Sequence, residues 1–290
     1  MNPVIVLFAA SVLWGCTWWP LKQLAQLGVT GLPQILVAYG SAALLLLPLL
    51  FVQYRRWRGE ARLVAGIFLL GGAANLAFAY ALIHGEVVRV MVLFYLLPVW
   101  GVLGGRFFLG ERIDGQRALA VALALSGAVL ILGGPDVLGA PPSWIDLIAI
   151  ASGFFFAMNN LCFRASQAAP VPAKVAAMFL GCAVFALLLL AGGVQAMPAG
   201  IPAFTWLLVI AAGLMLLTAT AGSQYGVTHL EAGRSSVIII MELVTAVITA
   251  AWWAGESMSG MEWLGGALIL GAALLEAWRP TPPPVQAPSS

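Results

Sequence analysis

The sequence predicts an all-α integral membrane protein whose ten transmembrane helices form two inverted-topology repeats of five helices each. Three observations lead to this fold class. The composition is too apolar for a water-soluble protein, the apolar residues fall into ten stretches of spanning length, and the second half of the chain repeats polar positions of the first.

The composition excludes a water-soluble fold. Of the 290 residues, 62% are hydrophobic and 8% are charged, and the mean hydropathy is +1.01. A soluble domain carries about 25% charged residues, so the surface of this chain must face lipid. The net charge of +2 is too small for a nucleic-acid partner. The three cysteines lie inside apolar stretches, which argues against a disulfide framework.

Ten apolar stretches reach the length of about 20 residues that a spanning helix needs. The first has no basic segment before it and no small-residue cleavage site, so we interpret it as a retained helix and not a signal peptide. The predicted spans are 3–22, 31–52, 63–83, 88–108, 117–133, 144–163, 174–195, 203–226, 234–254 and 261–278.

The basic residues predict the orientation of these spans. With the N-terminus in the cytoplasm, eleven of the 13 Lys and Arg residues fall at cytoplasmic joins, and only Lys22 and Arg89 fall outside. Cytoplasmic loops carry such an excess of basic residues. We therefore expect a multi-pass protein of the inner (plasma) membrane with both termini in the cytoplasm.

The two halves of the chain form an internal repeat. A shift of 145 residues aligns residues 80–131 with the second half without a gap, and near the start of each half a slightly different shift pairs Trp14 with Phe156, Thr17 with Asn159 and Lys22 with Arg164. The polar and glycine pairs of the longer alignment are Tyr80/Tyr225, His84/His229, Glu86/Glu231, Arg89/Arg234, Gly110/Gly255 and Glu111/Glu256.

Each copy holds five helices, an odd number, so the second copy must enter the membrane from the opposite side. Secondary transporters use inverted repeats of this kind to build a midplane site between the halves. We expect a first repeat over residues 1–135, a second over 136–279, and a disordered, Pro-rich cytoplasmic tail over 280–290. The chain contains no phosphate-loop motif for ATP.

Glu242 is the most informative single residue, because it lies near the middle of the ninth predicted span. An ionisable group at that depth costs at least about 2.5 kcal/mol on insertion scales, so it must face a cavity or a partner. Ser235, Thr245 and Thr249 share its helical face. It is a candidate site for a substrate amine or a proton; the alternative is a structural carboxyl bonded to a neighbouring helix.

Other polar and aromatic groups at membrane depth are candidates for the same cavity. Asn159, beside Asn160 in the sixth span, suits a polar ligand, although amide hydrogen bonds between helices would also explain the pair. The first span carries Trp14 too deep for the interfacial aromatic belt, in which Trp18 and Trp19 fit. The remaining candidates are Tyr39, Asn75, Tyr80, Tyr95 and Tyr225.

Three residues are candidates for a gate or hinge. Pro98 kinks the fourth span, and its preceding residue Leu97 is the repeat partner of Glu242. The kink either frees a carbonyl for a ligand or only shapes the bundle. His84 and His229 recur in a Tyr-x3-His-x-Glu-x2-Arg pattern, which indicates either paired gates or a duplicated helical turn.

These residues resemble the drug/metabolite transporter superfamily, specifically its EamA-type members of ten spans. The resemblance covers nearly the whole chain and rests on short motifs in order: Trp14-Gly15 with Lys22, Ala81-Leu82, Pro98, Leu109-Gly110-Glu111-Arg112, Ala254-Gly255-Glu256 and Gly265-Gly266.

Within the family the chain is most similar to YddG-type exporters of aromatic and other amino acids. Tyr95-Leu96-Leu97-Pro98 is similar to a Tyr-Leu-Trp-Pro segment of that type, with Leu97 in place of the tryptophan. Tyr39 stands where many relatives have Arg, and the ninth span has Glu242-Leu243 in place of the proline of the first copy. The resemblance implies a central cavity between spans one to four and six to nine, buttressed by spans five and ten.

We therefore expect a secondary transporter that exports amino acids or related small metabolites by alternating access. Aromatic faces would hold the side chain or ammonium of the substrate by packing and cation–π contact. Asn159 would bind its carboxylate, and Glu242 its ammonium or a coupling proton. Monomers are expected, without cofactor or metal.

Three rival functions stay open at this stage. The nearest is a multidrug exporter of organic cations coupled to protons through Glu242. An intramembrane enzyme would need two catalytic groups that can meet. The chain offers one deep carboxylate, and both histidines lie near span ends on opposite faces. A channel is the third rival, although one central carboxylate suits a gated binding site better than a ring of pore charges.

Overall fold

The computed structural model describes residues 1–85, 87–133, 141, 143–254 and 259–279. Within this part of the chain the regular structure is helical, without a strand. The predicted all-α class is therefore confirmed. The Pro-rich tail 280–290 and the repeat positions Glu86, Gly255 and Glu256 lie outside the described residues.

The first half of the chain forms the helices α1 (Pro3–Gly15), α2 (Trp18–Gln26), α3 (Leu32–Val52), α4 (Tyr54–Trp57), a 3₁₀ turn η1 (Arg58–Glu60), α5 (Ala61–His84), α6 (Val87–Phe94), α7 (Leu97–Leu109) and α8 (Gly115–Ile131). The second half forms α9 (Trp144–Ala165), α10 (Val171–Ala191), α11 (Ala203–His229), α12 (Ala232–Ile239), α13 (Met241–Ala254) and α14 (Gly260–Ala277).

Nine helical segments of the described chain are long and apolar enough to cross a membrane, and α8, with 17 residues, is a shorter apolar helix. Each predicted span coincides with one helical segment. Three of these segments consist of two helices each: α1 with α2, α6 with α7, and α12 with α13. Many large apolar side chains, among them Leu44, Phe107 and Trp252, point outward from the bundle. The protein is a multi-pass membrane protein, and the ten-span inverted repeat stays a prediction.

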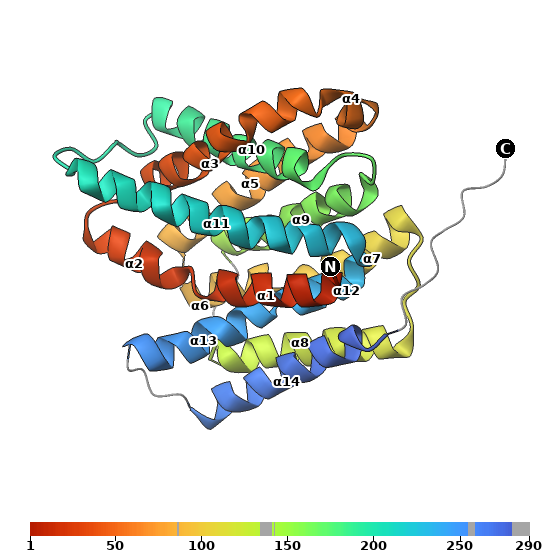
Figure 1. Ribbon diagram of the computed structural model, residues 1–290. Coiled ribbons are helices and arrows are strands. Elements are labelled where there is room, and N and C mark those ends of the chain that lie inside the picture. The colour runs from red at the N-terminus through yellow and green to blue at the C-terminus, as the bar shows by residue number, and fades with distance from the viewer. Residues whose placement is uncertain (86, 134–140, 142, 255–258, 280–290) are drawn as a thin grey trace.

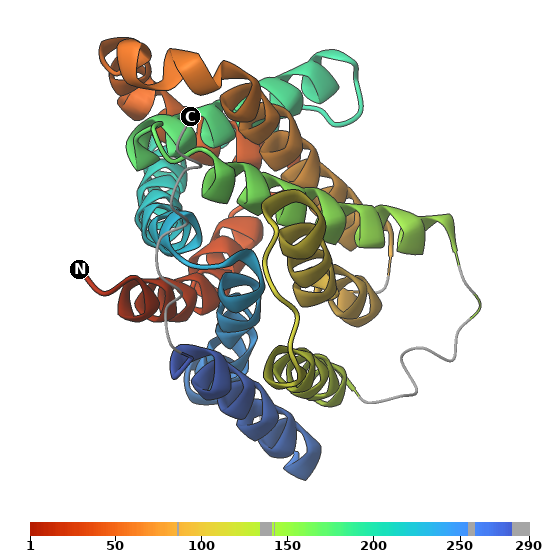
Figure 2. The ribbon, with the colours of Figure 1, turned by 90° about the vertical axis from the view of Figure 1, so that its right-hand side faces the viewer.

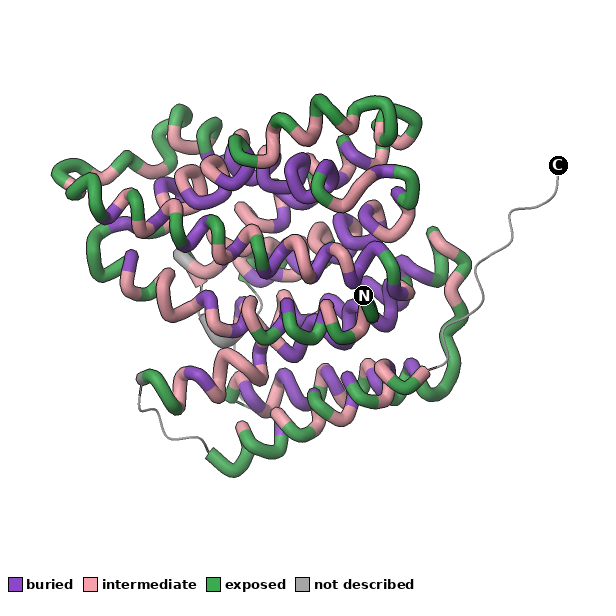
Figure 3. Tube along the Cα trace, in the orientation of Figure 1, coloured by how far each residue is buried: buried purple, intermediate pink, exposed green. Residues whose placement is uncertain are grey.

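The helices run along a common direction, which is horizontal in Figure 1, and the buried residues lie where they face one another (Figure 3). We call the end of the bundle that carries the N-terminus, at the right of Figure 1, the N-terminal face, and the other end the opposite face. In the chain direction, α1, α5, α8, α10 and α12 start at the N-terminal face, whereas α3, α7, α9, α11 and α14 end there. His229, at the end of α11, therefore lies at the N-terminal face.

Helices α8 and α14 form a pair at one edge of the bundle, at the bottom of Figures 1 and 2. Their backbones meet at two glycines, because a Cβ added to Gly127 or to Gly265 would overlap the carbonyl oxygen of the other residue. The pair corresponds to the fifth and tenth predicted spans, which therefore pack on each other beside the rest of the bundle.

Three of the predicted spans are broken near the middle of their length. The break between α1 and α2 precedes Pro20, and the break between α6 and α7 precedes Pro98, because a proline cannot donate to the carbonyl four residues earlier. The third break, at Ile240 between α12 and α13, has no proline. Under the 145-residue repeat Ile240 is the partner of Tyr95, so the second and third breaks fall at equivalent positions.

Candidate functional site

A cavity of about 340 Å³ lies at the level of the breaks. Seven of the ten predicted spans contribute to its wall, through α1, α2, α5, α6, α9, α10, α11, α12 and α13. It extends toward the opposite face, where Leu82 lies near the end of α5 and Met91 near the start of α6. The wall consists of Trp14, Gly15, Thr17, Trp18, Leu21, Ala74, Asn75, Phe78, Leu82, Met91, Phe94, Tyr95, Phe156, Met178, Ser223, Ile239, Glu242 and Ala246.

A carboxylate and a phenol join two of the breaks inside this cavity. Glu242 lies in the first turn of α13, where backbone N–H groups have no partner within the helix and favour a negative charge. The hydroxyl of Tyr95, the first residue of the α6–α7 break, donates to Glu242 Oε1 at 2.9 Å. The pair therefore connects the fourth span of the first half to the ninth span of the second.

The rest of the wall is aromatic and neutral. Six aromatic rings line it, and the ring centroids of Phe94 and Phe156 lie 5.9 Å apart. The Trp18 indole donates to Thr249 Oγ1 at 2.9 Å, which holds α2 against α13. Glu242 carries the only carboxyl side chain among the lining residues, and none of them is Lys, Arg or His. The cavity can therefore hold an apolar or aromatic body with one cationic or proton-donating group.

Close approach of the backbones positions Glu242. A Cβ added to Gly15 at the end of α1 would overlap the carbonyl oxygen of Glu242 and come within 2.5 Å of Thr245 Cβ. No other residue type fits there without moving a helix. Gly15 thus lets α1 lie directly against the start of α13 at the level of the carboxylate.

The structure brings Trp14, Tyr95 and Glu242 of the predicted site residues together, and Asn75 lies in the same wall. Tyr39 is buried behind the wall, where its hydroxyl donates to Asn75 Oδ1 at 3.0 Å. Asn159 is completely buried beside Asn160 and is not a lining residue.

Tyr80 and Tyr225 lie at the two ends of the bundle, away from the cavity wall. Each stacks on the histidine one helical turn later, with ring centroids 4.1 Å apart for Tyr80 and His84 and 4.2 Å for Tyr225 and His229. Each histidine Nδ1 also bonds the backbone carbonyl of its tyrosine, at 2.9 and 2.7 Å. The two copies of the motif thus form the same local structure at opposite faces, with both imidazoles exposed.

Pro98 is buried in the first turn of α7. The carbonyl that it leaves without a helical partner belongs to Phe94, the last residue of α6. A Cβ added to Gly153 of α9 would lie 2.5 Å from this carbonyl oxygen, so the oxygen is packed against α9.

Several lining residues were not predicted from the sequence. Trp18 was assigned to the interfacial belt, although it lies one turn after Trp14 and on the same helical face. Phe156 is the repeat partner of Trp14, which is a signal for the cavity. Phe78, Phe94 and the two lining methionines carry no such signal, because apolar residues are common everywhere in this chain.

A buried ionic cluster ties α12 to α8 and α14 at the N-terminal face. Arg117, 1% exposed, pairs with Glu231 at 2.5 Å, with Glu276 at 3.5 Å and with Glu111 at 3.7 Å. Glu111 also accepts from the first two backbone N–H groups of α12. Burial raises the pKa of Glu111, although these N–H groups and the guanidinium act in the other direction. The cluster fixes the start of α12.

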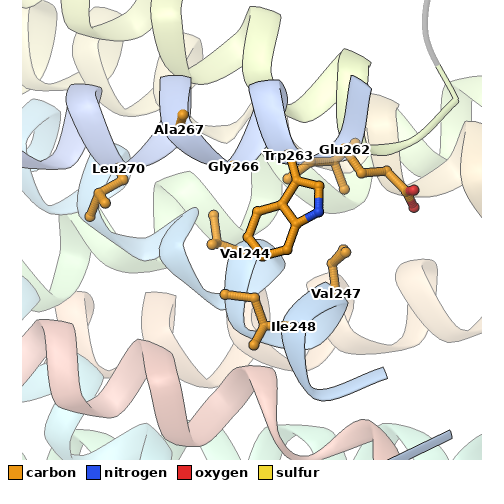
Figure 4. Close-up of a pocket in the computed structure, with 9 residues that line it drawn as sticks. Val244, Val247, Ile248, Glu262, Trp263, Gly266, Ala267 and Leu270 are labelled. Carbon is orange, nitrogen blue, oxygen red and sulfur yellow. The ribbon is translucent and has the colours of Figure 1, made fainter. Parts of the chain in front are cut away.

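A second hollow, of about 220 Å³, lies between α13 and α14 near the outside of the bundle (Figure 4). Its wall is apolar apart from Glu262, whose carboxylate accepts from the backbone N–H of Ser259 in the capping box of α14. Trp263 beside it is 60% exposed. Apart from this carboxylate and the indole N–H of Trp263 the wall is apolar, so we interpret the hollow as a lipid-facing groove and not as the candidate site.

Residues 1–133 match the EamA-like transporter family. Three relatives align with this chain over most of its length. An uncharacterized transporter of Archaeoglobus fulgidus is 25% identical over 222 residues, which are 75% of this chain and 77% of the relative. A riboflavin transporter of Rhizobium johnstonii is 29% identical over 251 residues, 81% of this chain and 77% of the relative.

The third relative is a probable terminal-alkyne amino-acid exporter of Streptantibioticus cattleyicolor, 28% identical over 225 residues, 75% of this chain and 74% of the relative. A solved crystal structure with 19% sequence identity superposes with a TM-score of 0.78 over 95% of this chain and 97% of the other, which shows a common fold. The family and the names of the relatives indicate a transporter rather than an enzyme.

Proposed function

Because residues 1–133 are an EamA-like transporter family domain, we propose that the protein is a secondary exporter of amino acids and related small metabolites in the inner membrane. The single observation that carries this proposal is the Glu242–Tyr95 pair in an aromatic cavity between the two halves. The Glu242 carboxylate takes the substrate ammonium or a coupling proton, and the aromatic rings hold the remainder by packing and cation–π contact.

Pseudo-symmetric packing supports alternating access between two inverted copies. Helix α1 packs on α11 and α9 packs on α5, which are equivalent pairs when the halves are exchanged. The family match ends at residue 133, close to the expected end of the first copy at 135. We place both termini in the cytoplasm because of the basic residues, and we propose a monomer.

The charge of the wall also favours a second candidate function, the export of organic cations or amines. An amino acid carries a carboxylate, which needs a cation or several hydrogen-bond donors. No lining residue is basic, and Asn159, the predicted carboxylate ligand, is not part of the wall. The ammonium half of an amino acid therefore has a partner in this cavity, whereas its carboxylate half has none of opposite charge.

Flux into proteoliposomes tests both candidates. The panel contains an aromatic amino acid, the corresponding amine, a permanently charged organic cation and riboflavin, each with and without a pH gradient. We expect transport of at least one of these compounds and slower transport by Glu242→Gln. Glu262→Gln is the matched control, because Glu262 lies in the lipid-facing groove and Gln preserves a capping box.

The outcomes separate the hypotheses. Preference for the amino acid over its amine supports the first candidate, and the reverse preference supports the second. Unaltered flux of Glu242→Gln at every pH would remove this carboxylate from the mechanism. No flux of any compound would contradict the proposed function.

A further inference from the structure

A cluster of buried amides and hydroxyls lies behind the cavity wall, in the halves of α9 and α11 that end at the N-terminal face. Asn160 Oδ1 accepts from Asn159 Nδ2 at 3.3 Å and from Gln224 Nε2 at 3.1 Å, so the cluster joins α9 to α11. Thr220 lies one turn before Gln224 on the same face of α11. The cluster adjoins the cavity at Met178, a lining residue whose Sδ is 3.9 Å from Asn159 Nδ2.

Three polar atoms of this cluster have no hydrogen-bond partner among the described residues: Asn159 Oδ1, Gln224 Oε1 and Thr220 Oγ1. Their residues are 0%, 1% and 2% exposed. Buried polar atoms are paired in the large majority of cases, because an unpaired one loses its hydration without compensation. Three such atoms in one cluster make it a candidate place for a polar partner in another state of the protein.

The internal repeat indicates which state that is. The 145-residue shift pairs Thr220 with Asn75, and the shift that pairs Trp14 with Phe156 also pairs Asn159 with Thr17. Asn75 and Thr17 both line the cavity that extends toward the opposite face. Asn159 and Thr220 of the buried cluster therefore occupy, in the second copy, positions that form the cavity wall in the first.

We infer that Asn159, Thr220 and Gln224 form a second binding station, which lines the transport pathway when this pathway opens to the N-terminal face. The inference rests on the proposed function. Two carbonyl oxygens and a hydroxyl make it a site for hydrogen-bond donors, such as the ammonium, amide or hydroxyl hydrogens of the substrate. Glu242, which lines the same cavity as Met178, binds the same chemical group in the first station.

The closed route continues from this station to the N-terminal face. Thr228 Oγ1 donates to the Gln224 carbonyl at 2.7 Å and accepts from the buried Lys174 Nζ at 2.9 Å. Lys174 also donates to the carbonyl oxygens of Phe163 and Ser166, at 2.8 and 2.9 Å. These hydrogen bonds connect the end of α9, the start of α10 and the end of α11. They must break when the route opens.

Cysteine accessibility tests the inference without knowledge of the substrate. In a full-length chain whose native cysteines are replaced by alanine, Thr220→Cys and its repeat partner Asn75→Cys are exposed to the membrane-impermeant reagent trimethylammonium-ethyl methanethiosulfonate. The reagent is applied to right-side-out and to inside-out vesicles. Gly115→Cys and Thr30→Cys, both at exposed positions, mark the N-terminal and the opposite face.

We expect Thr220→Cys to react only from the side marked by Gly115, and Asn75→Cys only from the side marked by Thr30. Reaction of Thr220→Cys from the side marked by Thr30, or no reaction while Asn75→Cys reacts, would overturn the inference and leave the proposed function intact. Two folded variants that react from neither side would overturn both.

A pair of stability measurements covers the possibility that a cysteine variant does not fold. Thr220→Val removes an unpaired hydroxyl, so we expect an unchanged or higher unfolding midpoint in detergent micelles. Thr228→Val, in the same helix, removes a hydroxyl with two partners, so we expect a lower midpoint. A loss of stability in Thr220→Val as large as that in Thr228→Val would show that Thr220 is structural, and it would overturn the inference.

Discussion

The contact of α1 with α13 at Gly15 can be tested by adding one methyl group. In Gly15→Ala the new Cβ would meet the Glu242 carbonyl oxygen, Thr245 Cβ at 2.5 Å and Ala246 N at 3.1 Å. Two of these atoms belong to the backbone and the third to a β-branched side chain, so none can move without moving α13. The methyl group must therefore push the two helices apart at the level of the carboxylate.

The magnitude follows from two opposing terms. Replacing Gly by Ala within a helix gains up to about 1 kcal/mol of helix propensity, and less at Gly15, which ends α1. Overpacking of a close contact costs about 1–3 kcal/mol. We expect a net loss of about 1–2 kcal/mol in the free energy of unfolding, together with slower transport, since the displaced start of α13 carries Glu242.

The assay is reversible unfolding in mixed detergent micelles, with flux into proteoliposomes as the second readout. Gly271→Ala is the matched control, because Gly271 lies inside α14 and a Cβ there meets no atom within 4 Å. The control should be as stable as the parent protein or slightly more stable. If Gly15→Ala behaved like Gly271→Ala in both measurements, the two helices could not be in contact at this point.

Three further predictions concern the ion pairs and hydrogen bonds. Tyr95→Phe keeps the ring but removes the hydroxyl that donates to the charged form of Glu242. We expect the binding free energy of a cationic substrate to weaken by about 1.5–3 kcal/mol, measured from the substrate concentration that gives half-maximal flux. Arg117→Met leaves buried carboxylates without their cation, and we expect a loss of about 3–5 kcal/mol in unfolding free energy. Asp114→Asn keeps the cap of α8 but breaks the pair with Arg279, which holds the pKa of Asp114 below its usual range. Because the folded-state pKa is lowered, the parent should be more stable than this variant at neutral pH, and the difference should vanish as pH falls through that pKa.

The sequence was sufficient to predict the membrane class and the approximate positions of the nine candidate spans in the described chain and of the shorter apolar helix α8, because such helices depend on length and hydropathy. Two of the three breaks also had a local cause that a sequence reveals, namely Pro20 and Pro98. The break at Ile240 has no such cause. It lies where the main packing partner changes from α7, for α12, to α1, for α13, which only the tertiary structure reveals.

The candidate site was predictable in part for a similar reason. Glu242 stands out in an apolar segment, because a charge at that depth needs a partner whatever its neighbours are. Neutral polar groups give a weaker signal, since they can donate to one another inside the bundle: the Tyr39 hydroxyl donates to Asn75, and the Asn159 amide to Asn160. Which of them reaches the cavity depends on helix rotation, and one helical face cannot be distinguished from another when both are apolar.

Helix α12 links the two charged features of the protein. Its eight residues are all buried, and its ends meet the N-terminal ionic cluster on one side and the break before Glu242 on the other. A buried helix of this length cannot bend without leaving close-packed contacts on several neighbours. A change of charge at Glu242 that moves the break therefore moves the whole helix, and with it the amides that hold Glu111. This is a physical route by which binding in the cavity can loosen the closed N-terminal face, and it requires no contact between the substrate and that face.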